Sequence, residues 1–390
     1  MRIFATMENA RSEFSPSATR VGVLGGGQLG KMLGIAAAPL SIPLYFLDPS
    51  AACPVSQIFR NVTTGEFKDE ETVFEFGKDK DLITIEIEHV NVNALERLKV
   101  AGKIIHPDPA ALRIIQDKGL QKEFYRDHGF PTSSFVLVSD ASEIKSGLET
   151  EKIKFPFVQK TRKAGYDGKG VAIIRSEKDL GKLLEGPSVI EDLVRLKMEI
   201  SVIVCRNASG EVASFPAVEM VFNPDANLVE FLVCPARISP KLEEKAASIA
   251  SKLITELNVC GLLAVELFVD ENEEIFINEV APRPHNSGHH TIEAHTTSQY
   301  EQHLRGILNL PLGSTGVLSP SAMLNLLGAP GFSGNAVYNN LDEVMRIPGV
   351  KVHIYGKEKT APFRKMGHVT ILASTAEEAL QKASEIKQKL

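Results

Sequence analysis

Two glutamates that face each other across a predicted hairpin constrain this chain more than any other feature. The runs 262–269 and 274–279 are rich in apolar and β-branched residues, and the turn-forming residues between them predict an antiparallel hairpin. In this hairpin Glu266 lies opposite Glu279. Two carboxylates that face each other among apolar side chains repel one another unless a cation lies between them. Oxygen ligands without histidine or cysteine favour Mg2+, with Mn2+ as a second candidate.

The register of the hairpin decides how apolar the surroundings of the two carboxylates are. A regular ladder places Phe268 opposite Ile277, and it places both of them, with Ala264, on the face that carries Glu266 and Glu279. The alternative is an edge hairpin whose two glutamates are solvated and bind nothing. The hairpin pattern alone is compatible with both interpretations.

The loop after the hairpin is unusually polar. It begins directly after Glu279 and runs from 280 to 290, with one arginine and three histidines. The histidines lack the spacing of a zinc site, and no cysteine lies near them in the sequence. Arg283 offers a bidentate fork to phosphate, and backbone amides near Gly288 add donors. The loop therefore predicts an anion-binding site at the end of a strand, a common place for binding residues.

Strands and helices alternate from residue 20 to about 117, and the strands end on polar residues such as Asp48 and Glu86. This order predicts a parallel sheet with a ligand at the carboxyl ends of its strands. The turn Gly25–Gly30 fits G-x-G-x-x-G between a strand and a helix, with Asp48 downstream. Alone it predicts an NAD-dependent dehydrogenase, but backbone amides at a helix N-terminus bind any phosphate. The turn therefore specifies a phosphate more firmly than it specifies NAD.

A loop rich in glycine and lysine lies between two predicted strands in the next part of the chain. One strand ends at Lys160, the loop spans 161–170, and Val171–Ile174 form the returning strand. Such a loop closes over a polyphosphate, because its glycines allow backbone contacts and its lysines neutralise charge. A flexible basic turn is the alternative. Glu191–Val194 form a strand-to-linker segment of the kind that holds an adenine edge, and Glu199 follows on the next strand, although either carboxylate alone is more typical of a surface residue.

Composition bounds the remaining possibilities. The 390 residues are 43% hydrophobic and 24% charged, which is ordinary for a soluble protein of two or three domains. The net charge of −6 argues against non-specific nucleic-acid binding. Four scattered cysteines form no disulfide framework and indicate a reducing cytoplasm, and no apolar run approaches the ~18 residues of a membrane span. Residues 1–19 are polar, lack the apolar core of a secretory signal, and are expected to form a flexible extension.

Taken together, these motifs resemble those of a known family. In order along the chain they are Lys160, the run Gly165-Tyr166-Asp167-Gly168-Lys169-Gly170, Glu191 to Val194, Pro235-Ala236-Arg237, Glu266, and the run from Asn278 to His289 that reads N-E-V-A-P-R-P-H-N-S-G-H. The set resembles the N5-carboxyaminoimidazole ribonucleotide synthetases, which are ATP-grasp ligases of purine biosynthesis. The likeness extends from about Arg20 to the C-terminus and includes Gly25–Gly30 and Arg364–His368.

The resemblance implies an α/β and α+β fold in three parts. A Rossmann-like pre-ATP-grasp domain would span 20–118, a two-lobed ATP-grasp body 119–187 and 188–316, and a small C-terminal domain 317–390. It also implies the reaction, which is ATP-dependent carboxylation of 5-aminoimidazole ribonucleotide with bicarbonate, through carboxyphosphate, to give the N5-carboxy product, ADP and phosphate. The expected state is a cytoplasmic homodimer without nucleic-acid or membrane partners.

The resemblance also carries over site residues in three groups. Expected ATP contacts are Lys118, Lys160, Gly165, Tyr166, Asp167, Gly168, Lys169, Gly170, Glu191, Asp192, Leu193, Val194, Glu199, Asn278 and Glu279. Expected ribonucleotide and bicarbonate contacts are Gly27, Gln28, Leu29, Glu88, His89, Arg283, His285, Asn286, Ser287, Lys357, Arg364 and Lys365. Expected catalytic residues are Asp167, Arg283, Lys357 and Arg364, and expected metal ligands are Glu266 and Glu279. The glycine turn then becomes a ribonucleotide-phosphate contact.

Three departures from the family pattern bear on these expectations. The segment Glu219–Phe222 lacks a histidine that many members have, Ala164 replaces a frequent glycine, and Lys118 stands where many relatives carry the fork of an arginine. Rival functions are a formate-using transformylase, a biotin-dependent carboxylase, a dehydrogenase and a catalytically silent ligand sensor. The run His285–His289 argues against the first two, and the intact acidic pair with Lys160 argues against the last.

Overall fold

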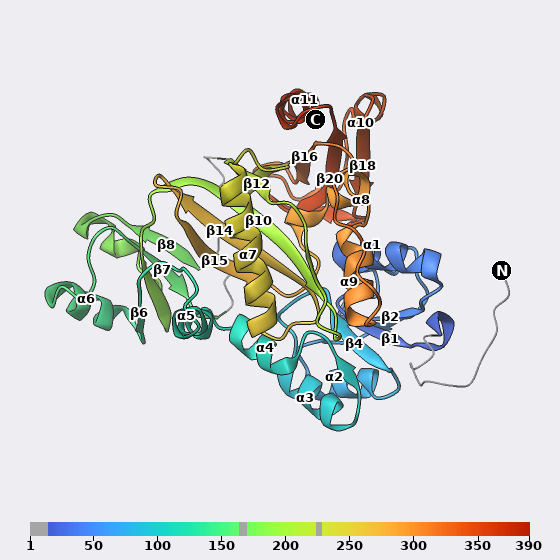
Figure 1. The fold of residues 1–390 in the computed structure, drawn as a ribbon, viewed down its shortest axis with the longest axis horizontal. Helices are drawn as coiled ribbons and strands as arrows, with labels where there is room; N and C mark the ends of the chain where they lie inside the picture. Colours follow the sequence, from blue (N-terminus) through green and yellow to red (C-terminus); the bar gives the residue numbers. More distant parts are fainter. Residues whose placement is uncertain (1–14, 164–169, 224–227) are drawn as a thin grey trace.

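The computed structural model describes residues 15–163, 170–223 and 228–390. It divides the chain into an N-terminal α/β part, a central body and a C-terminal part (Figure 1). Of the predicted extension 1–19, the structure describes only the last residues, which include the 3-10 turn η1 (Pro16–Ala18); the others lie outside the described residues. Within those described ranges, no helix combines the length and the apolar character that crossing a membrane requires.

The N-terminal part is built around a parallel sheet with the strand order β3-β2-β1-β4-β5. Its elements are β1 (Val21–Leu24), α1 (Gln28–Ala37), η2 (Ala38–Leu40), β2 (Leu44–Asp48), β3 (Val62–Thr64), α2 (Glu70–Gly77), β4 (Leu82–Ile85), α3 (Val92–Val100), β5 (Ile104–Ile105) and α4 (Pro109–Ile115). Strands β1 and β4 are buried along their whole length, as expected for a parallel sheet covered on both faces. The predicted parallel sheet, and the helix after the glycine turn, are confirmed.

A small antiparallel sheet with the order β6-β9-β7-β8 forms the first lobe of the central body, on the left of Figure 1. Its elements are α5 (Lys118–Asp127), β6 (Phe135–Val138), α6 (Ala141–Glu149), β7 (Phe157–Thr161), β8 (Val171–Ile174), η3 (Glu177–Lys182) and β9 (Ser188–Asp192). Strands β7 and β8 pair with Lys160 opposite Val171, so the two predicted strands and their pairing are confirmed. Residues 164–169 of its loop lie outside the described residues.

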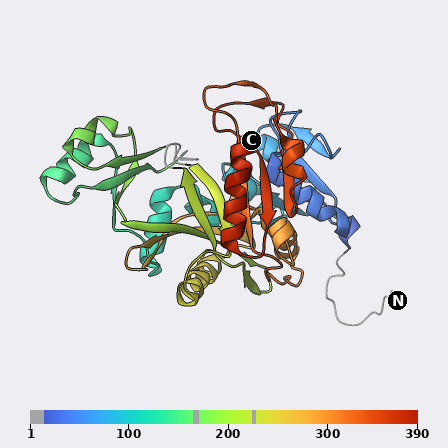
Figure 2. The same ribbon diagram turned by 90° about the horizontal axis from the view of Figure 1, so that it is seen from above.

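One long antiparallel sheet runs through the second lobe and into the C-terminal part (Figures 1 and 2). Its order is β15-β14-β10-β12-β13-β16-β20-β18, with β11 beside β10. The strands are β10 (Leu196–Arg206), β11 (Val212–Ser214), β12 (Val218–Asn223), β13 (Leu228–Cys234), β14 (Gly261–Asp270), β15 (Ile275–Ala281), β16 (Ser321–Leu327), β18 (Val350–Ile354) and β20 (Lys365–Leu372). The pairing of β13 with β16 joins the two parts, so the backbone ladder continues past residue 316.

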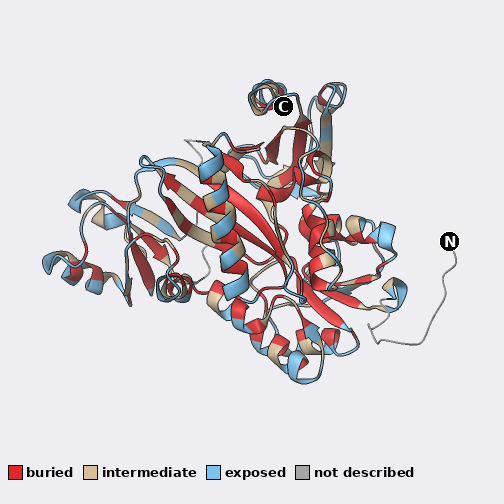
Figure 3. Cartoon of the chain, viewed as in Figure 1, coloured by how far each residue is buried: buried red, intermediate tan, exposed pale blue. Residues whose placement is uncertain are grey.

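Helices cover this sheet and connect it to the N-terminal part. The remaining elements are α7 (Pro240–Glu256), η4 (Asn286–Gly288), α8 (Thr291–Ala294), α9 (Gln299–Ile307), β17 (Gly334–Asn335), α10 (Leu341–Met345), β19 (Lys359–Thr360) and α11 (Ala376–Lys389). Helix α7 begins where the Ser239 hydroxyl accepts from the amide of Leu242, with Pro240 in the first turn. It packs on one face of β10 and β14, whose buried residues are red in Figure 3. Helix α9 shares a core with β1 and α1 through Tyr300 and Leu304.

The central hairpin confirms one predicted pair and corrects the other. Glu266 lies opposite Glu279, as predicted. Phe268 does not lie opposite Ile277, because Phe268 pairs with Phe276. The expectation that both residues share the face of the two glutamates was therefore wrong for Ile277. It was right for Phe268, which alternates onto the face of Glu266 and has its ring centroid 5.8 Å from Lys160 Nζ.

A β-bulge at Asn278 causes this shift. Two steps along β15 separate Glu279 from Ile277, whereas their partners on β14, Glu266 and Leu267, are neighbours. The bulge interrupts the alternation of side chains, so Ile277 packs into the core beneath α7 and is 1% exposed. Asn278 and Glu279 both contact lysines on the other side of the sheet. The extra residue thus turns two consecutive polar side chains toward one site.

Candidate functional site

Three carboxylates lie on the sheet face opposite α7. They are Glu199 on β10, Glu266 on β14 and Glu279 on β15, and Glu279 forms an ion pair with Lys118 at the start of α5. Burial raises the pKa of Glu266 to about 8, and the charges of Glu279 and Glu199 add to the effect. Burial also raises the pKa of Glu199 to about 7. Burial alone would raise the pKa of Glu279, but the ammonium of Lys118 outweighs burial and lowers this pKa.

This carboxylate group fits a hard divalent cation. Glu266 and Glu279 are directly opposed and supply only oxygen ligands, which suits Mg2+. The raised pKa of Glu266 reflects crowded negative charge at a buried position, and a cation between the two carboxylates would relieve that repulsion. The nearest imidazole, His285, keeps its Nε2 3.7 Å from Oε1 of Glu266. The residues present therefore agree with the metal predicted from the hairpin.

Two buried lysines share the carboxylate of Glu191 beside this group. Lys160 Nζ lies 3.2 Å from Glu191 Oε1 and donates to Oδ1 of Asn278 at 2.8 Å. Lys122 Nζ lies 3.2 Å from Glu191 Oε2. Ser133 donates to the same oxygen at 2.9 Å. Although burial opposes it, the two ammonium groups lower the pKa of Glu191, whereas burial lowers the pKa of Lys122 to about 8.

Lys122 is a site residue that the sequence reasoning missed. It lies one helical turn after Lys118 on α5, so both side chains are on the same helix face. The signal was this spacing, which becomes informative only when the helix is known to face the hairpin. Glu191 was expected to hold adenosine, and its carboxylate instead faces the lysines. As predicted, this strand runs into a linker: β9 ends at Asp192, and residues 193–195 connect it to β10.

The polar loop after β15 is held by carboxylate and hydroxyl partners. Arg283 donates to both oxygens of Glu88, from Nε at 2.5 Å and from Nη2 at 2.9 Å. Although burial opposes it, this pairing lowers the pKa of Glu88 to about 2. His285 Nδ1 lies 2.9 Å from Oγ of Ser287, and burial lowers the pKa of His285 to about 3, so its ring is neutral. Asn286 donates to Oδ1 of Asn325 at 2.9 Å.

The C-terminal part contributes cations to the same neighbourhood. The charge of Lys365 acts on the pKa values of both Glu266 and His285, so Lys365 lies near them. Lys357 Nζ donates to the carbonyl of Lys365 at 2.7 Å. Arg364 is exposed and donates to the carbonyl of Lys359, so its side chain contacts its own loop. Of the predicted basic residues here, the structure places Lys357 and Lys365 together.

The glycine turn is occupied by carboxylates of the same domain. Glu86 accepts from the amides of Gly27 at 2.8 Å and Gly30 at 2.9 Å, and Asp48 accepts from the amide of Gly26 at 2.8 Å. Gly25 has φ +103°, and a Cβ there would lie 2.5 Å from Glu86, so both conformation and space require glycine. A pyrophosphate would compete with Glu86 for these amides. The predicted contacts Gln28 and Leu29 open α1 at this turn, and the charge of His89 helps to lower the pKa of Glu88.

The remaining predicted positions either lie outside the described residues or make contacts within the protein. The loop residues Gly165, Tyr166, Asp167, Gly168 and Lys169, with the departure at Ala164, lie outside the described residues. Gly170 is described, and its carbonyl accepts from the amide of Thr161 at 2.9 Å. In the segment that departs from the family pattern, Glu219 accepts from Nε of Arg237 at 2.8 Å. No cysteine lies near the histidines in the sequence, but in space Cys234 packs beside His290 and His295.

Comparison with protein families assigns three regions of the chain. Residues 18–116 match the ribonucleotide synthetase preATP-grasp domain, residues 123–300 the ATP-grasp domain, and residues 321–382 the phosphoribosylaminoimidazole carboxylase C-terminal domain. The three matches follow in the predicted order. They confirm the predicted fold class.

Curated proteins and solved structures resemble this chain over most of its length. The N5-carboxyaminoimidazole ribonucleotide synthase of Bacillus subtilis is 36% identical over 366 residues, 93% of each chain. The phosphoribosylaminoimidazole carboxylase of Saccharomyces cerevisiae is also 36% identical, over 94% of this chain and 66% of that protein. The synthetase structure from Thermotoga maritima matches with 41% identity and a TM-score of 0.87, covering 95% and 98% of the two chains. The Aspergillus clavatus synthase in complex with ADP and 5-aminoimidazole ribonucleotide matches with 32% identity and a TM-score of 0.86, covering 96% and 100%.

Proposed function

The chain belongs to the N5-carboxyaminoimidazole ribonucleotide synthase family, and on this premise we propose that it couples ATP cleavage to the carboxylation of 5-aminoimidazole ribonucleotide by bicarbonate in purine biosynthesis. One observation carries the proposal. The end of β15 joins a cationic and acidic group around Glu279 to the anion-binding loop around Arg283, four residues later. A single strand end therefore holds the two halves of a phosphoryl-transfer and carboxylation site together.

The polyphosphate end uses the lysines and the facing carboxylates. Glu266 and Glu279 would hold Mg2+, which when bound neutralises charge on the transferring phosphoryl group. Lys118 pairs with Glu279 in the structure, so it would exchange this carboxylate for a phosphate when nucleotide and metal enter. Lys160 is positioned by Asn278 and Glu191, and its ammonium would then meet the phosphates from the neighbouring strand. In this proposal Glu199 and the backbone of the segment 191–194 line the adenosine, while the carboxylate of Glu191 holds the two lysines.

The chemistry needs an activated carboxyl group, because the hydroxyl of bicarbonate is a poor leaving group. A bicarbonate oxygen attacks the γ-phosphorus of ATP, the bond to ADP breaks, and carboxyphosphate forms. The ribonucleotide amine then attacks the carboxyl carbon, phosphate leaves, and the amine loses a proton. Positioning and charge neutralisation are the main contributions of the protein to such transfers. Asp167, Arg283, Lys357 and Arg364 are the residues proposed to act on the reacting groups.

The ribonucleotide end requires one exchange of partners. Glu88 accepts hydrogen bonds from Nε and Nη2 of Arg283 in the structure. An anionic substrate group would therefore have to displace Glu88 or share the guanidinium with it. The neutral ring of His285, with Asn286 and Ser287, would supply uncharged hydrogen bonds. The proposal assigns the phosphate to the turn at 27–29 and further contacts to Glu88, His89, Lys357 and Lys365. Homodimer formation, a cytoplasmic location and the domain limits 118, 187 and 316 also stay part of the proposal.

The experiment is ADP release measured with each candidate acceptor. ADP formation should require 5-aminoimidazole ribonucleotide, and labelled carbon from bicarbonate should appear in an acid-labile carbamate. Omission of bicarbonate serves as the matched control, because the nucleotide and the ribonucleotide still bind. If labelled formate enters the product and bicarbonate does not, the transformylase interpretation replaces this proposal.

A further inference from the structure

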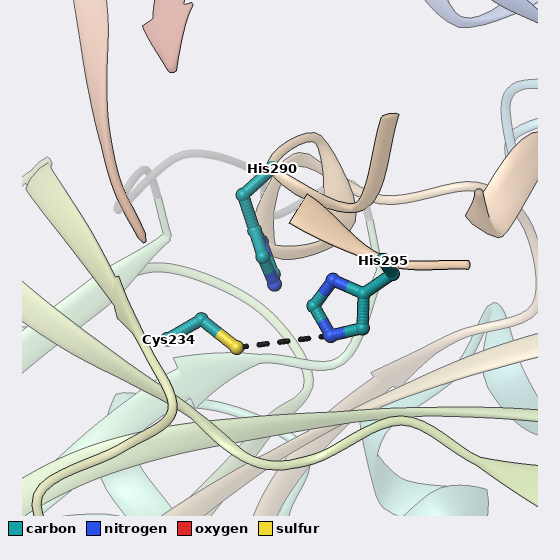
Figure 4. Close-up of side chains that lie close together, drawn as sticks. All are labelled: Cys234, His290 and His295. Carbon is teal, nitrogen blue, oxygen red and sulfur yellow. Dashed lines mark hydrogen bonds between the residues drawn. The ribbon is translucent and has the colours of Figure 1, made fainter. Parts of the chain in front are cut away.

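A cysteine and two histidines that are not among the carboxylate and lysine residues described above converge in the interior. The ligand atoms of Cys234, His290 and His295 all lie within 4.8 Å of one another (Figure 4). The three residues are 1%, 2% and 3% exposed. Cys234 ends β13, whereas His290 and His295 flank the short helix α8. The fold thus brings together residues from two segments about 60 positions apart.

The imidazoles in this cluster lack the hydrogen bonds that buried polar groups normally make. Among the described atoms, Nδ1 of His295 has no hydrogen-bond partner, and neither ring nitrogen of His290 has one in good geometry, although the backbone of Ser287 approaches that ring. Figure 4 shows the ring of His290 directed between Cys234 and His295. Ser321, which pairs with Cys234 on the neighbouring strand β16, also has a buried hydroxyl without a partner. Because unsatisfied buried polar groups are destabilising, their gathering points to a bound group.

One ligand-to-ligand distance in the cluster is already close to that around a bound metal ion. Cys234 Sγ lies 3.9 Å from Nε2 of His295. With metal–sulfur and metal–nitrogen lengths of about 2.3 and 2.05 Å, these two ligand atoms would be about 3.6 Å apart around a tetrahedral ion and about 3.8 Å apart around a trigonal one.

We propose that Cys234, His290 and His295 bind one soft metal cation, Zn2+ or Cu+. A thiolate with two imidazoles favours these ions over Mg2+, which prefers oxygen. Binding forms a metal–sulfur bond and releases the thiol proton to solvent, without any change of oxidation state. The ion would tie α8 to the β13–β16 junction that links the second lobe to the C-terminal part. The proposal does not depend on the proposed function, because none of the three residues belongs to the carboxylation site.

Metal titration of the reduced, chelator-treated full-length protein tests this site. Zn2+ and Cu+ are added separately under anaerobic conditions, with excess Mg-ADP present to occupy the carboxylates. One equivalent of Zn2+ or Cu+ should remain bound through gel filtration and raise the melting temperature. Co2+ should give a thiolate-to-metal charge-transfer band in the near ultraviolet, which only a cysteine ligand produces. The ion that is retained identifies which of the two the site prefers.

Variants separate this site from adventitious binding. Cys234→Ser and His295→Ala should each weaken binding more than tenfold and abolish the cobalt band. Cys53→Ser, which alters another buried cysteine, should leave both unchanged. Equal binding by wild type and Cys234→Ser, or no retained metal, overturns the proposal. If the variants do not fold, anomalous scattering from zinc-soaked or copper-soaked wild-type crystals decides: a peak between the three side chains supports the site, and water there overturns it.

Discussion

Glu191→Gln removes a negative charge that two buried lysines share. The carboxylate lies 3.2 Å from both Lys160 and Lys122, and all three residues are at least nine-tenths buried. Glutamine keeps the size of the side chain and a hydrogen bond to Ser133, so the change is mainly electrostatic. Loss of one partner of a buried ion pair generally costs about 3–5 kcal/mol of unfolding free energy. We expect a loss of unfolding free energy near the lower end of this range at pH 7, because Lys122 can become neutral by releasing its proton.

The pKa of Lys122 determines how much this deprotonation contributes and how the contribution depends on pH. In the folded wild type this pKa is about 8, below the value of about 10.4 in an unfolded chain. The unfolded chain therefore binds more protons between these values, and wild-type stability rises with pH in that window. Without Glu191 the pKa of Lys122 falls further. At pH 7, one unit below the wild-type pKa, neutral Lys122 in the variant forgoes at most about 1.4 kcal/mol of the stability that its charged form gains from Glu191. At pH 9 Lys122 is already mostly neutral in the wild type, so this part of the loss vanishes.

Urea unfolding at pH 7 and pH 9 measures both quantities. Circular dichroism and tyrosine fluorescence serve as probes because the chain has no tryptophan, and coincident transitions justify a two-state treatment. The variant should lose about 3 kcal/mol at pH 7 and up to about 1.4 kcal/mol less at pH 9. The exposed neighbour Glu185→Gln is the control and should change little at either pH. A loss below about 1 kcal/mol at pH 7 would refute the charge-sharing argument, since it would match an exposed pair.

Three further expectations concern the proposed reaction. Glu279→Gln should reduce ATP turnover about 100-fold or more while the circular dichroism spectrum is unchanged. The control Glu271→Gln, in the turn of the same hairpin, should have normal turnover. A fully active Glu279→Gln enzyme excludes the metal assignment. Arg283→Lys should raise KM for the ribonucleotide about tenfold or more, because lysine lacks the fork that Arg283 offers; steady-state kinetics with an unchanged KM would count against this contact. NAD should cause no thermal shift, because its pyrophosphate would have to displace Glu86 from the turn amides without any other proposed contact. The ribonucleotide faces the same competition at the turn, but it also gains the contacts proposed at the loop around Arg283, so it should stabilise the protein; an NAD shift would restore the dehydrogenase interpretation.

Local sequence was sufficient for the elements and for the facing carboxylates. Alternating apolar residues around a short turn specify a hairpin, so the pairing of Glu266 with Glu279 followed from neighbours in the chain. The strand–glycine turn–helix order of the N-terminal sheet is equally local, and it was predicted correctly. The polar loop after β15 was found for the same reason, since its residues are contiguous.

Tertiary packing decided the details on which the chemistry depends. The bulge at Asn278 arises where β15 must bury Ile277 beneath α7 and still present consecutive polar residues to the lysines, and a regular alternation cannot do both. The pairs Arg283–Glu88 and Lys122–Glu191 join residues 195 and 69 positions apart. Sequence periodicity shows which face a residue occupies on its own strand or helix, but it does not show which distant element covers that face. That choice is made by burial of the whole core.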